Sequence, residues 1–345
     1  MGIQKSKLNK KIIEQILIEE YNIKPTKIEE INRGTANIFE IDTYTKKYIL
    51  KEFNEKRTIE SIEKEINIIN FLKERNINVP QYMKTKNDKF YMKNKGRIII
   101  LQEFIDGYTM ENNTGDYEKT IESATILGKI TKALKEYPNL SEENIIERQF
   151  SKRSIQNGII RMQDLKKELK ENNIYKSKIE QDLDFKIEIS KEIEKNFDFN
   201  IIKKMTTTNA HGDYSVQQLI YKNHGETTVI DFETAKKLPI VWEVIRSYSY
   251  IDKEAKNGEL NIKTLVDYFK EFSQYVELNE YDLKYAPHIY LIQLVSSVFG
   301  YKNYNNDYSQ KELLNFAFFR TKLCKYLYEN LEKISLELRI LKEKM

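Results

Sequence analysis

The sequence predicts an α+β protein of two lobes, in which an antiparallel sheet with one packed helix precedes a larger, mainly helical lobe. Residues 27–104 contain short runs with strand-like alternation, interrupted by one segment with helical spacing. From residue 116 onward, helical spacing dominates. Since 345 residues exceed the usual size of a single core, we expect a boundary after residue 104, giving lobes of residues 1–104 and 105–345.

The N-terminal lobe is expected to begin with an amphipathic helix over residues 8–20, which ends before Pro25. Five strands follow, and a helix over residues 58–75 lies between the third and the fourth. An order of strands, helix and strands is typical of an antiparallel sheet covered by a single helix. The expected strands are 28–31, 38–43, 47–53, 89–92 and 97–104.

The C-terminal lobe follows the crossover at Asp106-Gly107 and is expected to be mostly helical. Two short apolar runs, residues 219–221 and 228–230, interrupt the helices and are predicted to form a β-hairpin. The expected helices are 116–136, 142–172, 176–196, 240–256, 262–275, 281–299 and 310–344.

Composition excludes several classes of function. With 57 basic and 53 acidic residues the net charge is +4, which is too small to argue for nucleic-acid binding. No apolar run approaches the roughly 18 residues of a membrane helix, and lysines interrupt the N-terminal segment, so we expect a cytoplasmic protein. The one cysteine, Cys324, is expected to be a buried helix residue.

Three oxygen-bearing side chains flank the predicted hairpin. Asp213 lies in a polar loop, Gln218 begins the first strand and Asp231 follows the second. Hairpin formation should bring them together, and oxygen ligands suit a hard cation such as Mg²⁺. A carboxylate that receives a proton beside two such ligands is what phosphoryl transfer from a magnesium-bound nucleotide requires.

A second group of candidate residues lies in the N-terminal lobe. Gly34 and Thr35 occupy a turn between strands, where backbone N–H groups can face phosphates. Lys51 lies on a later strand and can neutralise phosphate charge, or it can be an ordinary exposed strand residue. Glu65 on the following helix is the best candidate to hold Lys51, with Glu63 second.

Two side chains near Asp231 in sequence have expected structural roles. Glu243 and Arg246 share one helix face and are predicted to pair. His211 is expected to order its loop through hydrogen bonds, and Trp242 to lie in the core.

The boxes His211-Gly212-Asp213 and Ile230-Asp231-Phe232 resemble those of the aminoglycoside phosphotransferase family, which includes antibiotic kinases and choline kinases. The resemblance runs from about residue 27 to residue 250. It implies a protein-kinase-like fold, with Asp213 as the catalytic residue and with Asp231 and Gln218 as magnesium ligands. Gln218 stands where the family has asparagine. The resemblance further implies nucleotide-binding roles for Gly34, Thr35, Asn37, Lys51, Glu65, and the hinge residues Glu103 and Ile105.

This resemblance implies phosphorylation of a small-molecule hydroxyl by ATP or GTP with Mg²⁺, with an aminoglycoside-type antibiotic as the leading acceptor. Choline or another amino alcohol is second, and a non-catalytic pseudokinase or spore-coat-type protein of the same fold is the alternative. A cationic acceptor would need carboxylates or aromatic faces, for which Glu233, Asp252 and Tyr248 are candidates. We expect a monomer or homodimer with no nucleic-acid or membrane partner.

Overall fold

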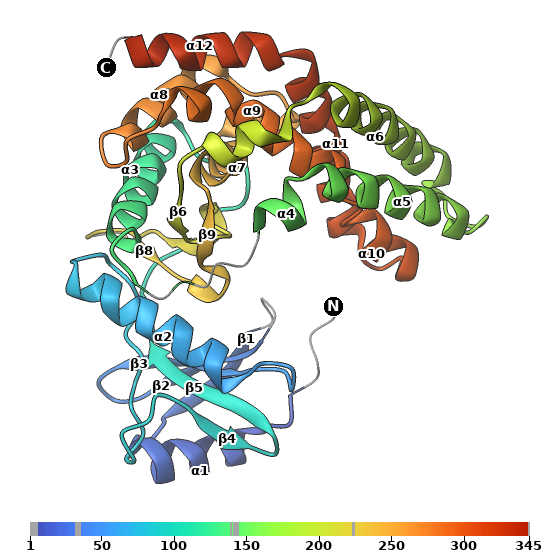
Figure 1. Ribbon diagram of the computed structural model, residues 1–345. Coiled ribbons are helices and arrows are strands. Elements are labelled where there is room, and N and C mark those ends of the chain that lie inside the picture. Colours follow the sequence, from blue (N-terminus) through green and yellow to red (C-terminus); the bar gives the residue numbers. More distant parts are fainter. Residues whose placement is uncertain (1–5, 32–35, 139, 141–144, 223–224, 344–345) are drawn as a thin grey trace. The chain divides into compact units, whose positions relative to one another are not determined.

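The computed structural model describes residues 6–31, 36–138, 140, 145–222 and 225–343, and the chain divides into two compact units. The N-terminal unit consists of Met1–Thr109 and Gln218–Thr234, and the C-terminal unit of Met110–Gln217 and Ala235–Met345. The first is built on an antiparallel sheet and the second is mostly helical, which confirms the predicted α+β class (Figure 1).

The N-terminal unit contains a five-stranded antiparallel sheet with the order β1-β2-β3-β5-β4. The prediction of a strand at residues 89–92 was wrong, because β4 begins where that run ends. Its register is set by a two-residue turn, Lys95-Gly96, in which both residues have positive φ. The strands are β1 (Lys27–Ile31), β2 (Asn37–Asp42), β3 (Lys47–Glu52), β4 (Met92–Asn94) and β5 (Arg97–Glu103).

Two helices, α1 (Lys10–Tyr21) and α2 (Ile59–Glu74), cover opposite faces of this sheet (Figure 1). Both helices were predicted from the sequence, but only one of them was expected to pack against the sheet. Ile13 and Leu17 of α1 join a core with Leu50 of β3 and its neighbours. Since successive strand residues point to opposite faces, Lys51 points away from α1, toward the face that α2 covers.

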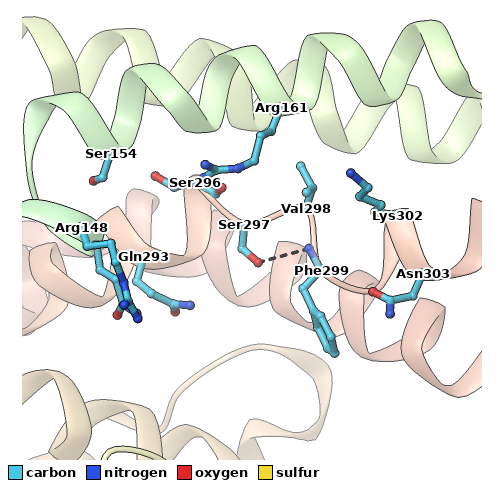
Figure 2. A pocket seen from close by; sticks show the side chains of 11 residues that line it. Arg148, Ser154, Arg161, Gln293, Ser296, Ser297, Val298, Phe299, Lys302 and Asn303 are labelled. Atoms are coloured by element: carbon cyan, nitrogen blue, oxygen red, sulfur yellow. Dashed lines mark hydrogen bonds between the residues drawn. The ribbon is translucent and has the colours of Figure 1, made fainter. Parts of the chain in front are cut away.

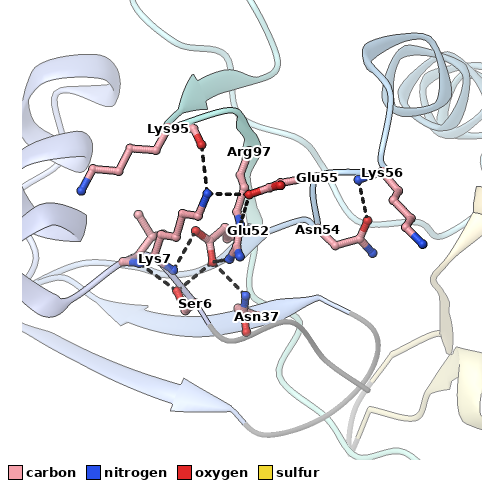
Figure 3. Close-up of polar contacts among 10 residues, drawn as sticks. Ser6, Lys7, Asn37, Glu52, Asn54, Glu55, Lys56, Lys95 and Arg97 are labelled. Carbon is pink, nitrogen blue, oxygen red and sulfur yellow. Dashed lines mark hydrogen bonds and ion pairs between the residues drawn. The ribbon is translucent and has the colours of Figure 1, made fainter. Parts of the chain in front are cut away.

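A buried polar cluster ties the chain's N-terminal segment to this sheet. The carboxylate of Glu52 is 1% exposed and accepts hydrogen bonds from Ser6 Oγ at 2.7 Å, Asn37 Nδ2 at 2.8 Å and Arg97 Nη1 at 3.1 Å. Figure 3 shows these donors converging on Glu52 from three separate segments. Because a buried carboxylate is stable only when it is paired, the cluster fixes β2, β3 and β5 relative to one another.

The C-terminal unit holds the remaining helices. The single helix expected over residues 142–172 is divided into two. The first ends at Gln149, and the side chain of Ser151 forms a capping box that starts the second. The expected helix 310–344 is likewise divided at Asn330. The helices are α3 (Tyr117–Leu134), α4 (Ile145–Gln149), α5 (Lys152–Glu168), α6 (Lys176–Asn196), α7 (Ile240–Ile251), α8 (Ile262–Ser273), α9 (Glu280–Val295), α10 (Tyr301–Asn306), α11 (Lys311–Glu329) and α12 (Leu331–Glu343).

Within the described residues, none of the helices has the length and apolar character needed to cross a membrane. Cys324 lies buried in α11, as expected, and burial raises the pKa of its thiol to about 12.

Two pairs of short strands position the predicted site. In the C-terminal unit, β6 (Thr207–Ala210) pairs with β9 (Lys236–Pro239); β6 leads into the His211 loop and β9 leads into α7. In the N-terminal unit, β7 (Leu219–Ile220) pairs with β8 (Thr228–Val229), which confirms the predicted hairpin.

Candidate active site

The loop that carries Asp213 is held by one buried carboxylate. Glu243 on α7 is fully buried, and its two oxygens accept backbone N–H groups from His211 at 3.1 Å, Gly212 at 2.6 Å and Tyr214 at 3.2 Å. Gly212 has φ +85°, a left-handed conformation that glycine adopts without strain. Burial raises the pKa of Glu243, while the three donors favour its charged form. The loop is therefore fixed by charge-assisted hydrogen bonds.

Asp213 itself is held by Arg246, one turn beyond Glu243 on α7. Arg246 Nη2 donates to Asp213 Oδ1, and Arg246 Nη1 donates to the carbonyl oxygen of Tyr214 at 3.0 Å. The predicted pairing of Glu243 with Arg246 was wrong, because each of these side chains binds the loop instead. His211 orders the loop as expected, since its Nδ1 accepts the N–H of Asp213 at 3.4 Å. With 47% of its side chain exposed, Asp213 is oriented and still accessible.

The hairpin of the N-terminal unit brings Gln218 close to Asp231. The N–H of Ile230 donates to the carbonyl oxygen of Gln218 at 3.0 Å, and Asp231 follows directly. Asp231 has φ +68°, an unusual conformation for a residue with a side chain and one that occurs often at functional sites. Its exposed carboxylate makes no hydrogen bond or ion pair with any residue that the structure describes. An accessible carboxylate without a protein partner, next to an amide-bearing residue, fits a hard cation.

The predicted ion pair between Lys51 and Glu65 is absent from the described part of the chain. Glu65 is buried and accepts from Arg57 Nη2 at 2.9 Å and from the Tyr82 hydroxyl at 3.0 Å. Arg57 lies immediately before the cap of α2, so its guanidinium reaches a carboxylate two turns along that helix. Lys51 is half-buried and makes no hydrogen bond or ion pair with a described residue, so its ammonium group is not committed to a carboxylate.

Arg57 also contacts Glu233 through Nη1, and Asp231 acts on it electrostatically. Its guanidinium therefore interacts with three carboxylates of the N-terminal unit, those of Glu65, Glu233 and Asp231. Sequence reasoning missed Arg57, because a contact between a loop residue and a residue eight positions later follows no helical or strand period.

The three residues predicted to contact a cationic acceptor are engaged with other protein groups. Glu233 pairs with Arg57. Tyr248 and Asp252 are buried, and the Tyr248 hydroxyl lies within hydrogen-bond distance of two acceptors, Asp252 Oδ2 at 2.5 Å and the carbonyl oxygen of Asn261 at 2.8 Å. Asp252 also caps the turn that follows α7. These contacts account for Tyr248 and Asp252 as structural residues of the C-terminal unit.

The predicted nucleotide-binding residues differ in how far the structure describes them. Gly34 and Thr35 lie outside the described residues, whereas Asn37 is buried and donates to Glu52. Glu103 uses its N–H to bond the carbonyl oxygen of Gln81 at 2.9 Å. The backbone N–H and C=O of Ile105 make no hydrogen bond with a described residue.

The structure therefore assembles two halves of the predicted site. Asp213 is fixed in the C-terminal unit, while Gln218 and Asp231 are joined in the N-terminal unit. The meeting of Asp213 with the other two stays a prediction, because the carboxylates belong to different units.

Comparison with solved structures shows the fold. A spectinomycin phosphotransferase, crystallised with ADP and spectinomycin, has a TM-score of 0.65 at 15% identity and covers 94% of this chain and 98% of its own. An amicoumacin kinase with AMP-PNP and Ca²⁺ has a TM-score of 0.62 at 13% identity, with coverage of 92% and 94%. A microcompartment-associated aminopropanol kinase has a TM-score of 0.62 at 13% identity, with coverage of 96% and 100%.

Among curated protein sequences, none matches this chain. The sequence model of the phosphotransferase enzyme family matches residues 27–272 and so spans both the hairpin and the loop of Asp213. This match covers more than half of the chain and confirms the resemblance drawn from the His211 and Asp231 boxes. The chain belongs to the phosphotransferase enzyme family.

Proposed function

We propose that this protein transfers a phosphoryl group from a magnesium-bound nucleotide, ATP or GTP, to a hydroxyl of a small molecule. The observation that carries the proposal is the environment of Asp213. The buried carboxylate of Glu243 holds its loop and the guanidinium of Arg246 holds its side chain, yet 47% of that side chain is exposed. This is the arrangement that a residue needs in order to orient an acceptor hydroxyl and receive its proton.

In this proposal, Asp231 and Gln218 would hold the metal ion, which would supply positive charge to the transferring phosphates. Asp231 fits this role because its carboxylate is exposed and unpaired among the described residues. Lys51 points toward the α2 face of the sheet and would contact the nucleotide phosphates, and the backbone of Ile105 would bind the base. Glu65 pairs with Arg57, so in this proposal its role is to hold Arg57 against α2, and it does not position Lys51.

The resemblance favours an aminoglycoside-type antibiotic as acceptor and an amino alcohol as second choice. The relatives with known ligands act on spectinomycin, amicoumacin and aminopropanol. Glu233, Asp252 and Tyr248 do not support a cationic acceptor, because all three are engaged by other protein groups. Residues other than these three must therefore determine which charge the acceptor carries.

Asp213→Asn tests the reaction without removing the acceptor for Arg246. We expect turnover to fall by about 100- to 10,000-fold, the usual contribution of a general base, with nucleotide affinity unchanged. A mass-shift screen of hydroxyl-bearing acceptors measures turnover, and titration with a non-hydrolysable nucleotide measures affinity. Asp88→Asn, at an exposed position on a surface turn, is the control. Equal turnover in Asp213→Asn and the parent protein would refute the assignment, and absence of transfer by both would favour the non-catalytic alternative.

A further inference from the structure

The C-terminal unit contains a pocket of about 390 Å³ where α4 and α5 face the end of α9 and the segment leading into α10 (Figure 2). Its size lies within the range of small-molecule sites. Three cations line it, Arg148, Arg161 and Lys302, and none of the described residues along its walls is an aspartate or a glutamate. The pocket is therefore positively charged although the whole chain is nearly balanced.

Arg161 and two further cations, Arg320 and Lys186, donate hydrogen bonds to the Ser296-Ser297 wall of this pocket. Arg161 Nη2 donates to the carbonyl oxygen of Ser296 at 3.0 Å, and Arg320 Nη1 donates to Ser297 Oγ at 3.2 Å. Buried Lys186 donates to the carbonyl oxygen of Ser297. All three acceptors are neutral oxygens, so these hydrogen bonds bring no negative charge to the cations.

Carboxylates reduce this field only in part. Asp182 acts on Lys186, and it also accepts the hydroxyl of Tyr301 at 2.6 Å. Arg161 and Lys302 form no ion pair with any residue that the structure describes. Several cations around one concave wall focus a positive potential in the pocket, and an anionic ligand would complete the charge balance.

The neutral groups of the pocket also point to a polar ligand. Gln293 Oε1 is buried and has no hydrogen-bond partner in the described structure. Figure 2 shows its side chain beside that of Arg148. Since an unpartnered buried polar atom is costly, Gln293 is suited to a ligand that bonds its amide.

The pocket is linked to Asp213 through α7 and α9. Gln293 lies one turn after Tyr290 on α9, and the Tyr290 hydroxyl bonds Ser249 Oγ of α7 at 2.9 Å. The same helix α7 carries Arg246, which binds Asp213. The pocket and the proposed catalytic residue therefore belong to one packed unit, joined by a direct helix–helix contact.

We propose that this pocket binds an anionic group, a phosphate or a carboxylate, of the acceptor molecule. The inference rests on the proposed phosphotransfer and defines its substrate class as a hydroxyl compound that carries negative charge. Arg161 and Lys302 recognise the anion, and Gln293 bonds a neighbouring polar group. This substrate class departs from the aminoglycoside-type acceptor that the resemblance favours, because the ammonium groups of an aminoglycoside would meet like charges at this wall.

Binding can be tested without nucleotide, by calorimetric titration at low salt. The probes are inorganic phosphate, glucose 6-phosphate and gluconate, with glucose as the neutral and kanamycin as the polycationic comparison. We expect a phosphate or carboxylate compound to bind more tightly than glucose. The double variant Arg161→Met/Lys302→Met should weaken that binding by about 10-fold or more, as expected for losing charge-assisted hydrogen bonds. Both side chains are exposed, so the variant should fold, which its melting curve checks.

Lys333→Met, at an exposed lysine on α12, is the matched control and should bind like the parent. Phosphate and gluconate distinguish the two anion sources. Equal anion affinity in the double variant and the parent, or preferential binding of kanamycin, would overturn the inference.

A mass-shift screen with nucleotide separates this inference from the proposed function. Transfer to anionic hydroxyl compounds supports both. Transfer to cationic acceptors alone, with a KM that the double variant leaves unchanged, overturns the anion pocket and leaves phosphotransfer standing. Anion binding that the double variant loses, without transfer to any acceptor, supports the pocket and refutes the proposed reaction.

Discussion

Replacing Glu243 with glutamine should loosen the loop of Asp213 while preserving the size of the side chain. In the native protein, Oε1 accepts the N–H groups of Gly212 and Tyr214, and Oε2 accepts that of His211. The glutamine retains most hydrogen bonds when its oxygen occupies the Oε1 position, because that oxygen then accepts the N–H groups of both Gly212 and Tyr214. Its NH₂ group then faces the N–H of His211, donor against donor.

The cost follows from these contacts. One buried N–H without an acceptor costs about 1 to 3 kcal/mol, and two further bonds change from charged to neutral acceptors. Burial disfavours the charged form of Glu243 and so raises its pKa. Replacing this carboxylate with a neutral amide removes that cost and offsets part of the loss. We therefore expect unfolding free energy to fall by about 2 kcal/mol and turnover to fall by about 10- to 100-fold, since small displacements of a catalytic group have effects of this size.

Urea denaturation followed by tryptophan fluorescence measures the stability directly. Trp242, the only tryptophan in the sequence, precedes Glu243 and reports on the C-terminal unit. Glu337→Gln on the exposed side of α12 is the control and should match the parent protein. If Glu243→Gln unfolds at the parent's urea concentration and retains its turnover, the carboxylate does not hold the loop and the reasoning fails.

Two further predictions concern stability. Burial lowers the pKa of Lys186 to about 8, so between pH 8 and 10.5 the unfolded chain binds more protons than the folded one, and stability should rise with pH. The rise should be on the order of 3 kcal/mol relative to Lys186→Met, and urea titrations at both ends of this window that show parallel curves would refute it. Arg97→Met should destabilise the N-terminal unit by about 3 to 5 kcal/mol, because it leaves the carboxylate of Glu52 buried without its guanidinium partner; proteolysis of that unit at an unchanged rate would contradict this.

The sequence predicted elements best where local pattern and tertiary packing agree. The hairpin around Gln218 and Asp231 could be predicted because two short apolar runs are separated by a polar turn. The prediction of one helix over residues 142–172 was wrong because the apolar spacing continues through Ser151. The capping box of Ser151 depends on hydrogen bonds, which apolar spacing does not reveal.

The candidate site was predictable in its residue types and less so in its contacts. Asp213 and Asp231 stand out because acidic residues follow short strands or tight loops. Side-chain partners could not be read from periodicity, since Arg57 reaches Glu65 from a loop and Arg246 reaches Asp213 across 33 positions. For the same reason, the sequence did not indicate the cationic pocket, whose residues come from α4, α5, α9 and α10.

The magnesium dependence of nucleotide binding in Asp213→Asn and Asp231→Asn tests the proposed metal site most directly. In the proposed mechanism the two carboxylates have separate tasks, one toward the acceptor hydroxyl and one toward the metal. The parent and Asp213→Asn should both bind a non-hydrolysable nucleotide more tightly when magnesium is present, and Asp231→Asn should bind it equally with and without the metal. An Asp231→Asn protein that retains the parent's full magnesium dependence would show that Asp231 does not hold the metal.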